Sequence, residues 1–260
     1  MTDDLDPARL QTLITGEWGR SMTVLESTAS TMDDASSAAR SGAPDGHVVV
    51  ADWQAHGRGA HGRAWVSPPG SDLYLSIVAR PDVDPSSTAL VTLATGLGVR
   101  DAVAGYLPNR RVEVKWPNDI WIERRKCAGI LVESRMLGAK IEAAIIGIGL
   151  NVNRTRWPSE LQGIATSLKL ERGEDAPLDR SEVLATLLEH VERWVKRFVR
   201  DGAPTLVNAL RPHLSLVGER VRWEDGHGVF EGIDERGAAL IRTDAGVLSL
   251  HAARIQPATE

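Results

Sequence analysis

The segment KIEAAIIGIGLNVN, residues 140–153, is apolar along most of its length and carries two glycines at alternate positions. Such a run is typical of a buried strand inside a sheet. Two further apolar runs, VEVKW at 112–116 and AGILVES at 128–134, precede it closely. The alternating segment DLYLSIVAR lies earlier, at 72–80, and the apolar run that starts at His47 comes before that. These segments predict the strands of one sheet.

Segments with helical periodicity lie between and after these strands. Residues 180–201 carry an apolar stripe, and Gly202 is expected to stop that helix. Residues 86–107 predict an Ala/Gly-rich helix that packs tightly, and residues 7–18 predict a short amphipathic helix. The Ser/Thr run STASTMDD at 27–34 is expected to begin a further helix and to cap it with side-chain oxygens.

The last part of the chain has a different pattern. From about residue 217, short apolar runs are separated by turn sequences such as Asp225-Gly226, which predicts a small β-barrel. We therefore expect an α+β fold with a larger domain at residues 1–212, in which helices pack on one side of a mixed β-sheet. A small barrel domain is expected at residues 213–260.

Composition excludes several classes of protein. The formal net charge is −5, so no overall positive field is available to attract nucleic acid or an anionic membrane. The single cysteine, Cys127, excludes an intramolecular disulfide framework and is expected to be a packed residue. The polar, acidic N-terminus differs from a signal peptide, and no apolar run is long enough to span a bilayer. We expect a cytoplasmic protein.

A glycine-rich loop, HGRGAHGRAW at 56–65, is the first candidate functional segment. Glycines let the backbone approach an anion, and the guanidinium groups of Arg58 and Arg63 can bind phosphate oxygens in pairs. The loop lacks the Lys-Ser/Thr ending of a Walker loop. The alternative interpretation is a surface loop whose arginines are solvated.

Two further segments place cations near apolar strands. KWPND at 115–119 brings together a lysine, an indole and a rigid bend, with Asp119 available for Mg²⁺, although Pro-Asn-Asp is also ordinary turn chemistry. Lys126 stands just before a buried strand, where it either extends to solvent or serves a site.

The glycines of IIGIGLN, residues 145–151, suggest a binding surface. Gly147 and Gly149 point to the same face of a strand, so that face lacks side chains. The gap either receives a neighbouring backbone or forms the floor of a ligand slot. Asn151 is expected on the same side.

Together and in this order, GRGxHGRxW (57–65), KWPND (115–119), RKxAGILVE (125–133) and GIGLN (147–151) resemble the biotin protein ligase family. STMDDA at 30–35 resembles the family's Ser-Thr-Asn helix start, and the C-terminal strands resemble its SH3-like domain. The similarity extends over nearly the whole chain, roughly residues 22–256. It implies the class II synthetase-like fold of the biotin–lipoyl ligase catalytic domain.

The resemblance also implies a reaction. Biotin and ATP, with Mg²⁺, form biotinyl-5′-AMP and pyrophosphate, and a lysine on the acceptor domain of a biotin-dependent carboxylase then receives the biotin. Because two anions meet in the first step, positive groups should converge there, and no protein nucleophile is needed. The implied catalytic residues are Arg58, Arg63, Lys115 and Lys126.

Site residues follow from the same resemblance, position by position. The implied biotin-binding residues are Ser30, Thr31, Met32, Gln54, Gly57, Arg58, Gly59, Ala60, Lys126, Gly129, Gly147 and Gly149. The implied ATP-binding residues are Arg58, Arg63, Trp65, Lys115, Trp116, Asn118 and Asn151, and Asp119 is the implied metal ligand.

The chain departs from the family pattern at two positions. Met32 stands where the family often has Asn, which removes one hydrogen bond to biotin. Ala60 stands where many members carry another arginine, so we expect faster loss of biotinyl-AMP. Only 29 residues precede Ser30, and they are acidic, so we expect none of the DNA binding of the family's regulatory branch.

Other functions remain open at this stage. A lipoate or octanoate ligase or transferase would share the fold, but Ser30, Thr31 and Gln54 favour a ligand with a ureido group. A non-catalytic module that captures a nucleotide or phosphopeptide is the alternative from a different class. The sequence allows a homodimer without indicating one.

Overall fold

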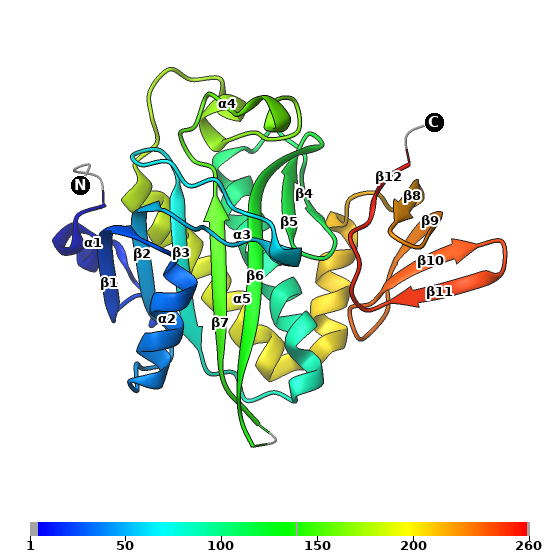
Figure 1. The fold of residues 1–260 in the computed structure, drawn as a ribbon, viewed down its shortest axis with the longest axis horizontal. Helices are drawn as coiled ribbons and strands as arrows, with labels where there is room; N and C mark the ends of the chain where they lie inside the picture. The colour runs from blue at the N-terminus through cyan, green and yellow to red at the C-terminus, as the bar shows by residue number, and fades with distance from the viewer. Residues whose placement is uncertain (1–4, 139, 259–260) are drawn as a thin grey trace.

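The computed structural model describes residues 5–138 and 140–258, which form a seven-stranded mixed sheet, its helices and a smaller C-terminal sheet (Figure 1). In the large sheet β1 and β2 run parallel, and the other neighbouring pairs are antiparallel. Its strands, in spatial order, are β1 (Met22–Thr28), β2 (His47–Gln54), β3 (Leu73–Ala79), β7 (Lys140–Leu150), β6 (Arg125–Leu137), β5 (Asp119–Ile122) and β4 (Val112–Lys115).

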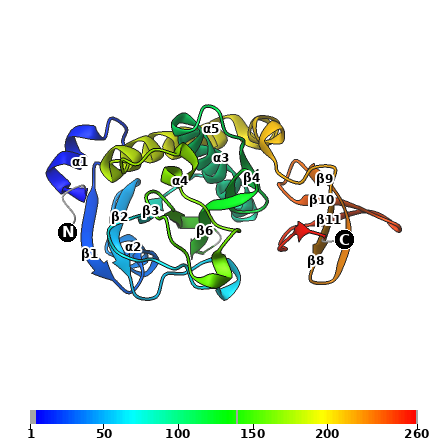
Figure 2. The same ribbon diagram turned by 90° about the horizontal axis from the view of Figure 1, so that it is seen from above.

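Two long helices, α3 (Thr88–Tyr106) and α5 (Arg180–Leu210), cover one face of this sheet (Figures 1 and 2). They approach each other closely at Gly98, where a Cβ would come 2.6 Å from the Cα of Val191. The small residue therefore allows the two helices to touch, as the Ala/Gly-rich sequence of α3 predicts.

The helix α5 was expected to end at Gly202, and the structure has a sharp kink there. Gly202 has φ 77° and ψ 176°, and a second helical segment follows it as far as Leu210. Pro204 stands at the start of this second segment, where its missing N–H disturbs no helical hydrogen bond.

A shorter helix, α2 (Thr31–Arg40), lies on the opposite face of the sheet. Its buried residues pack with Val49, Val78 and Ile145, whereas Val48 and Val50 belong to the core under the long helices. Strand alternation explains this division, since successive side chains point to opposite faces. Helices on one side of the sheet are thus confirmed for the long pair, and α2 is the exception.

The first helix is shorter than the sequence predicts. α1 (Pro7–Leu13) begins at the N-cap Asp6 and ends because Ile14 is extended, so the expectation of a helix to residue 18 was wrong. The chain leaves the helix so that Trp18, 2% exposed, can pack against Gly46 and donate to Asp45 at 3.1 Å. A further short helix, α4 (Leu168–Arg172), follows β7.

The C-terminal strands form an antiparallel sheet at one end of the molecule (Figure 2). Its order is β11 (Gly246–Leu250), β10 (Ala239–Thr243), β9 (Gly226–Ile233), β8 (Arg220–Trp223) and β12 (Gln256–Pro257). In the described residues no pairing between β11 and β12 closes it into a full barrel. The sheet contacts the larger domain where the Trp116 indole donates to the Gly237 carbonyl at 2.9 Å. The boundary at residues 212 and 213 stays a prediction. Within the part of the chain described, no helix is long and apolar enough to cross a membrane.

Candidate active site

A pocket lies on the α2 face of the sheet, beneath the segment that links β2 to β3. Figure 1 shows this segment crossing in front of β7 and β6. Arg58 and Lys126, far apart in sequence, both line the pocket. The complete lining is Ser30, Thr31, Met32, Gln54, Arg58, Gly59, Ala60, Trp65, Leu75, Asn118, Lys126, Gly129, Ile130, Leu131, Gly147, Ile148 and Gly149. Most of the residues expected to bind biotin are therefore brought together.

The floor of the pocket consists of glycines from two paired strands. Gly129 of β6 lies opposite Gly149 of β7 in the strand register. A Cβ on Gly149 would come 2.3 Å from Cε2 of Trp65, and a Cβ on Gly147 would come 2.5 Å from the sulfur of Met32. The space directly above these glycines is therefore occupied by the side chains of Trp65 and Met32, and not by a neighbouring backbone.

Polar side chains gather at the end of the pocket nearest α2. The amide and hydroxyl of Thr31 donate to Oε1 of Gln54 at 2.9 and 3.1 Å, and Nε2 of Gln54 donates to Ser67 at 3.0 Å. Ser30 stands at the N-cap of α2, but its side chain makes no capping hydrogen bond. The expectation that side-chain oxygens of this segment cap the helix was therefore wrong. Its hydroxyl is buried, has no hydrogen-bond partner among the described residues, and belongs to a residue that lines the pocket. It is available to a ligand.

The glycine-rich loop at 56–65 is held against the rest of the protein by Arg58. Its guanidinium contacts Asp33 at 3.0 Å and Glu133 at 3.2 Å, which joins the loop to α2 and to β6. Gly57 lies outside the pocket lining. A Cβ at Gly57 would come 2.4 Å from the carbonyl oxygen of Trp65, so the backbone turn itself requires glycine here.

A cluster of cations lies beside the pocket, around one carboxylate. Lys126 contacts Asp119 at 2.5 Å, and Lys115 contacts the same carboxylate at 3.8 Å. Burial lowers the pKa of Lys115 to about 8, Asp119 opposes this shift, and the charges of Lys126, Arg254 and Arg63 add to it. So many like charges around one acid favour a polyanionic ligand.

The expected metal site is not a good fit for a protein-held Mg²⁺. Asp119 is already paired with two ammonium groups. Within the described residues no group of three or more His, Cys, Asp or Glu side chains could hold a metal ion. Mg²⁺ commonly binds with one or two carboxylates and substrate phosphates, and not in a dedicated all-protein cage.

Several expected nucleotide residues lie outside this pocket. The amide of Asn151 donates to the Thr166 carbonyl at 2.9 Å, and the indole of Trp116 is bonded to Gly237. Arg63 is exposed and lies beside the cation cluster. Asn118 does line the pocket, and its amide donates to the Ile130 carbonyl at 2.7 Å.

Trp65, an expected ATP-binding residue, lines the same pocket as the expected biotin-binding residues. Its ring stands over Gly149 and Gly129, with its centroid 5.2 Å from the ammonium of Lys126, and in the described part of the chain its buried Nε1 has no partner. It therefore forms a wall of the glycine-floored pocket. Cys127 is fully buried, which raises the pKa of its thiol and confirms that it is a packed residue.

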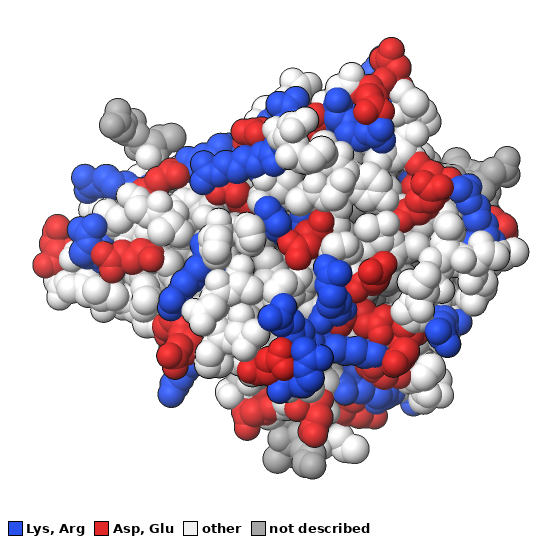
Figure 3. All heavy atoms as spheres, turned by 180° about the vertical axis from the view of Figure 1, so that it is seen from behind, with Lys and Arg blue, Asp and Glu red and all other residues white. Residues whose placement is uncertain are grey.

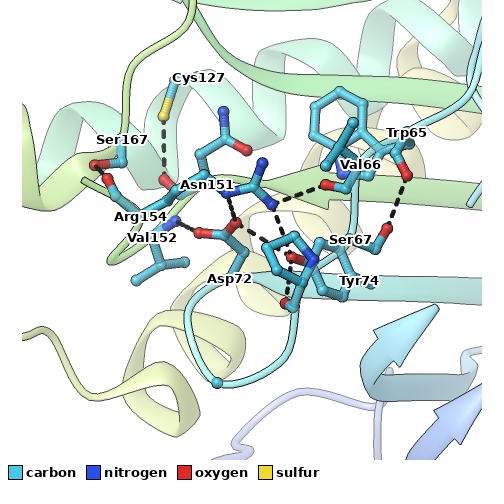
Figure 4. A network of polar contacts seen from close by, with 12 residues as sticks. Trp65, Val66, Ser67, Asp72, Tyr74, Cys127, Asn151, Val152, Arg154 and Ser167 are labelled. Atoms are coloured by element: carbon cyan, nitrogen blue, oxygen red, sulfur yellow. Dashed lines mark hydrogen bonds and ion pairs between the residues drawn. The ribbon is translucent and has the colours of Figure 1, made fainter. Parts of the chain in front are cut away.

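A buried network that the sequence did not reveal holds the segment after Trp65 (Figure 4). Arg154 pairs with Asp72 at 2.8 Å and donates to the Val66 carbonyl at 2.8 Å and to the Tyr74 hydroxyl at 3.2 Å. Through Val66 the network fixes the backbone next to Trp65. Asp72 stands just before the apolar strand β3 and Tyr74 lies within it, and such polar groups in or beside a buried run are the signal that could have revealed the network.

Comparisons with known proteins agree with this arrangement. Residues 24–151 match the model of the biotin/lipoate A/B protein ligase family, and residues 216–256 match the biotin protein ligase C-terminal domain. A biotin–[acetyl-CoA-carboxylase] ligase of Mycobacterium tuberculosis is 36% identical over 88% of this chain and 86% of its own length. A bifunctional ligase/repressor BirA of Bacillus subtilis is 34% identical over 88% of this chain and 71% of its own length.

A solved structure extends the likeness to three dimensions. A biotin protein ligase from Aquifex aeolicus, in complex with biotin and ATP, superimposes with a TM-score of 0.79 at 28% identity. The match covers 92% of this chain and all of that one. The chain belongs to the biotin/lipoate A/B protein ligase family and, within it, to the biotin protein ligases.

Proposed function

We propose that this protein activates biotin with ATP as biotinyl-5′-AMP and transfers the biotin to a lysine of an acceptor domain. The observation that carries the proposal is the pocket whose lining joins the glycines of β6 and β7, the polar groups of Ser30, Thr31 and Gln54, and Lys126. Biotin carries complementary groups, because a ureido ring and a carboxylate stand at opposite ends of an apolar body.

The polar end suits the ureido ring. The buried hydroxyl of Ser30 lacks a partner, and a buried polar atom without one is destabilising until a ligand supplies it. Thr31 and Gln54 lie beside it, already bonded to each other, and so are oriented in advance. The acyl chain would lie beside Trp65 and Met32, whose side chains stand directly over Gly149 and Gly147.

The carboxylate end suits adenylation. A carboxylate oxygen attacks the α-phosphorus of MgATP, and the bond to pyrophosphate breaks. Lys126 and Lys115 would hold the two approaching anions and the charge that develops on the phosphate, while Arg63 and Arg254 would meet the outer phosphates. Catalysis then rests on orientation and on charge stabilisation.

The loop at 56–65 would shield the adenylate from water. The contacts of Arg58 with Asp33 and Glu133 support this role, because they close the loop onto two other elements. The acceptor would be a biotin carboxyl carrier domain of a biotin-dependent carboxylase, as the names of the relatives suggest. We place the protein in the cytoplasm.

The alternatives find less support. A lipoate or octanoate ligase would bind an apolar chain, for which the polar cluster at Ser30 and Gln54 is unsuited. We also propose no role in binding nucleic acid, since the net charge is −5. On the helical face acidic and basic side chains are interspersed and form no broad positive field (Figure 3).

The test is incubation of the protein with biotin, MgATP and a biotin acceptor domain, followed by intact mass measurement. One biotin adduct on one lysine is expected, and it should disappear without ATP. Arg58→Ala and Lys126→Ala should strongly reduce the rate of labelling. Absence of any adduct with the unsubstituted protein contradicts the proposal.

A further inference from the structure

A second cavity lies beside the pocket, between the two domains. Its volume is about 180 Å³, and it extends from the first turns of α3 to the segment between β11 and β12. Its lining is Ala60, Ala89, Thr92, Leu93, Trp116, Pro117, Asn118, Ile130, Leu131, Val132, Gly237, His251, Ala252 and Ala253. Ala60, Asn118, Ile130 and Leu131 also line the first pocket, so the two spaces share a wall.

The lining differs in chemistry from the cation cluster. Its described residues are mostly apolar, with Thr92, Asn118 and His251 as the polar members, and none is Lys, Arg, Asp or Glu. A triphosphate is best bound by several cationic side chains, and none of the described lining residues is Lys or Arg. The cavity therefore fits an apolar chain better than a polyanion.

We propose that the acceptor lysine side chain enters through this cavity to reach the acyl-adenylate. The inference rests on the proposed function and adds the route of the second substrate. The four methylenes of a lysine would lie against Ala89, Leu93 and Ala253. Its nitrogen would emerge at Asn118, whose neighbour Asp119 contacts Lys126, expected beside the biotin carboxylate.

The surroundings also suit the chemistry of an attacking amine. An apolar channel that ends near Lys115 and Lys126 disfavours a third ammonium group, so the entering lysine loses its proton readily. The neutral nitrogen forms a bond to the acyl carbon, and the bond from that carbon to the phosphate oxygen breaks. AMP leaves with the electron pair, and the proton released by nitrogen passes to the departing phosphate.

Narrowing the cavity from either wall tests the route. Ala89→Phe acts from α3, where Ala89 is exposed, and Ala253→Leu acts from the C-terminal domain. Biotin-dependent pyrophosphate exchange should stay within about twofold, whereas transfer of biotin from preformed adenylate to the acceptor domain should fall at least about tenfold. Ala245→Phe, at the exposed turn between β10 and β11, is the matched control and should change neither rate.

Small amines test the channel without the acceptor domain. n-Butylamine, which copies the lysine side chain, should attack the enzyme-bound adenylate with a saturable rate that Ala89→Phe reduces. Hydroxylamine, being smaller, should be little affected. Unchanged transfer in both variants overturns the proposal, and a parallel fall in pyrophosphate exchange assigns the cavity to the nucleotide instead. If the unsubstituted protein shows no biotin-dependent exchange, it is the proposed function that fails.

Discussion

The indole ring of Trp65 occupies the space that a side chain at Gly149 would need, since a Cβ there would come 2.3 Å from Cε2. A loop residue and a strand residue, far apart in sequence, are thus fitted to each other. The fit leaves Lys126 5.2 Å from the same ring, at the end of the glycine floor. Trp65 therefore contacts both the glycine floor and the side chain of Lys126.

A methyl group on this floor should weaken biotin binding. Gly149→Ala must displace Trp65 or be displaced itself, which moves a wall of the pocket, and affinity for biotin should fall by about tenfold, or about 1.4 kcal/mol of binding free energy. Calorimetric titration with biotin measures the loss. Gly105→Ala is the control, because Gly105 is exposed in α3 and, among the described residues, nothing outside the adjacent helix backbone and chain neighbours lies within 4 Å of the added carbon. Equal affinity in the two variants contradicts biotin binding on this floor.

Affinity for ATP should depend on pH through Lys115. Its pKa is lowered to about 8 by burial, so below that pH the ammonium is already charged in the free protein. Above it, binding of the triphosphate must be accompanied by proton uptake, and affinity should fall by up to about tenfold per pH unit. Titrations with MgATP in buffers of different ionisation enthalpy measure the uptake. Lys115→Met should bind more weakly and with less pH dependence, and an unchanged profile in this variant contradicts the assignment.

Ala60 should limit how long the protein retains biotinyl-AMP. This residue lines both cavities, so Ala60→Arg would add a cation next to the expected phosphate. Dissociation of the adenylate should slow several-fold, as followed by release of labelled biotinyl-AMP. Ala60→Met controls for side-chain length without charge. The prediction fails if the arginine and methionine variants release the adenylate at the same rate as the unsubstituted protein.

Much of the fold was predictable because local pattern and burial agree. The apolar runs at 72–80 and 140–153 become β3 and β7, where both faces of the strands are covered. The short strand β5 (Asp119–Ile122) was not predicted, since four residues give too little periodicity. α1 ends early because Trp18 packs into the core, which is a tertiary effect that outweighs helical periodicity.

The candidate site was predictable in its members but less so in their contacts. The motifs placed Arg58, Lys126 and Gly149 in one region, and all three line one pocket. The partners of Arg58, which are Asp33 and Glu133, come from two other elements, and no local pattern signals them. The same holds for Arg254, which reaches the cation cluster only because the C-terminal sheet packs beside it.

Exchange of labelled pyrophosphate into ATP measures the central claim most directly, because it isolates the step in which the carboxylate meets the α-phosphate. The unsubstituted protein should catalyse exchange that depends on biotin and is not supported by lipoate or octanoate. Lys126→Met should reduce it by about 10²- to 10³-fold, the usual effect of removing a charge that stabilises a transition state. Exchange that is independent of biotin, or that persists at a near-normal rate in Lys126→Met, would contradict the account.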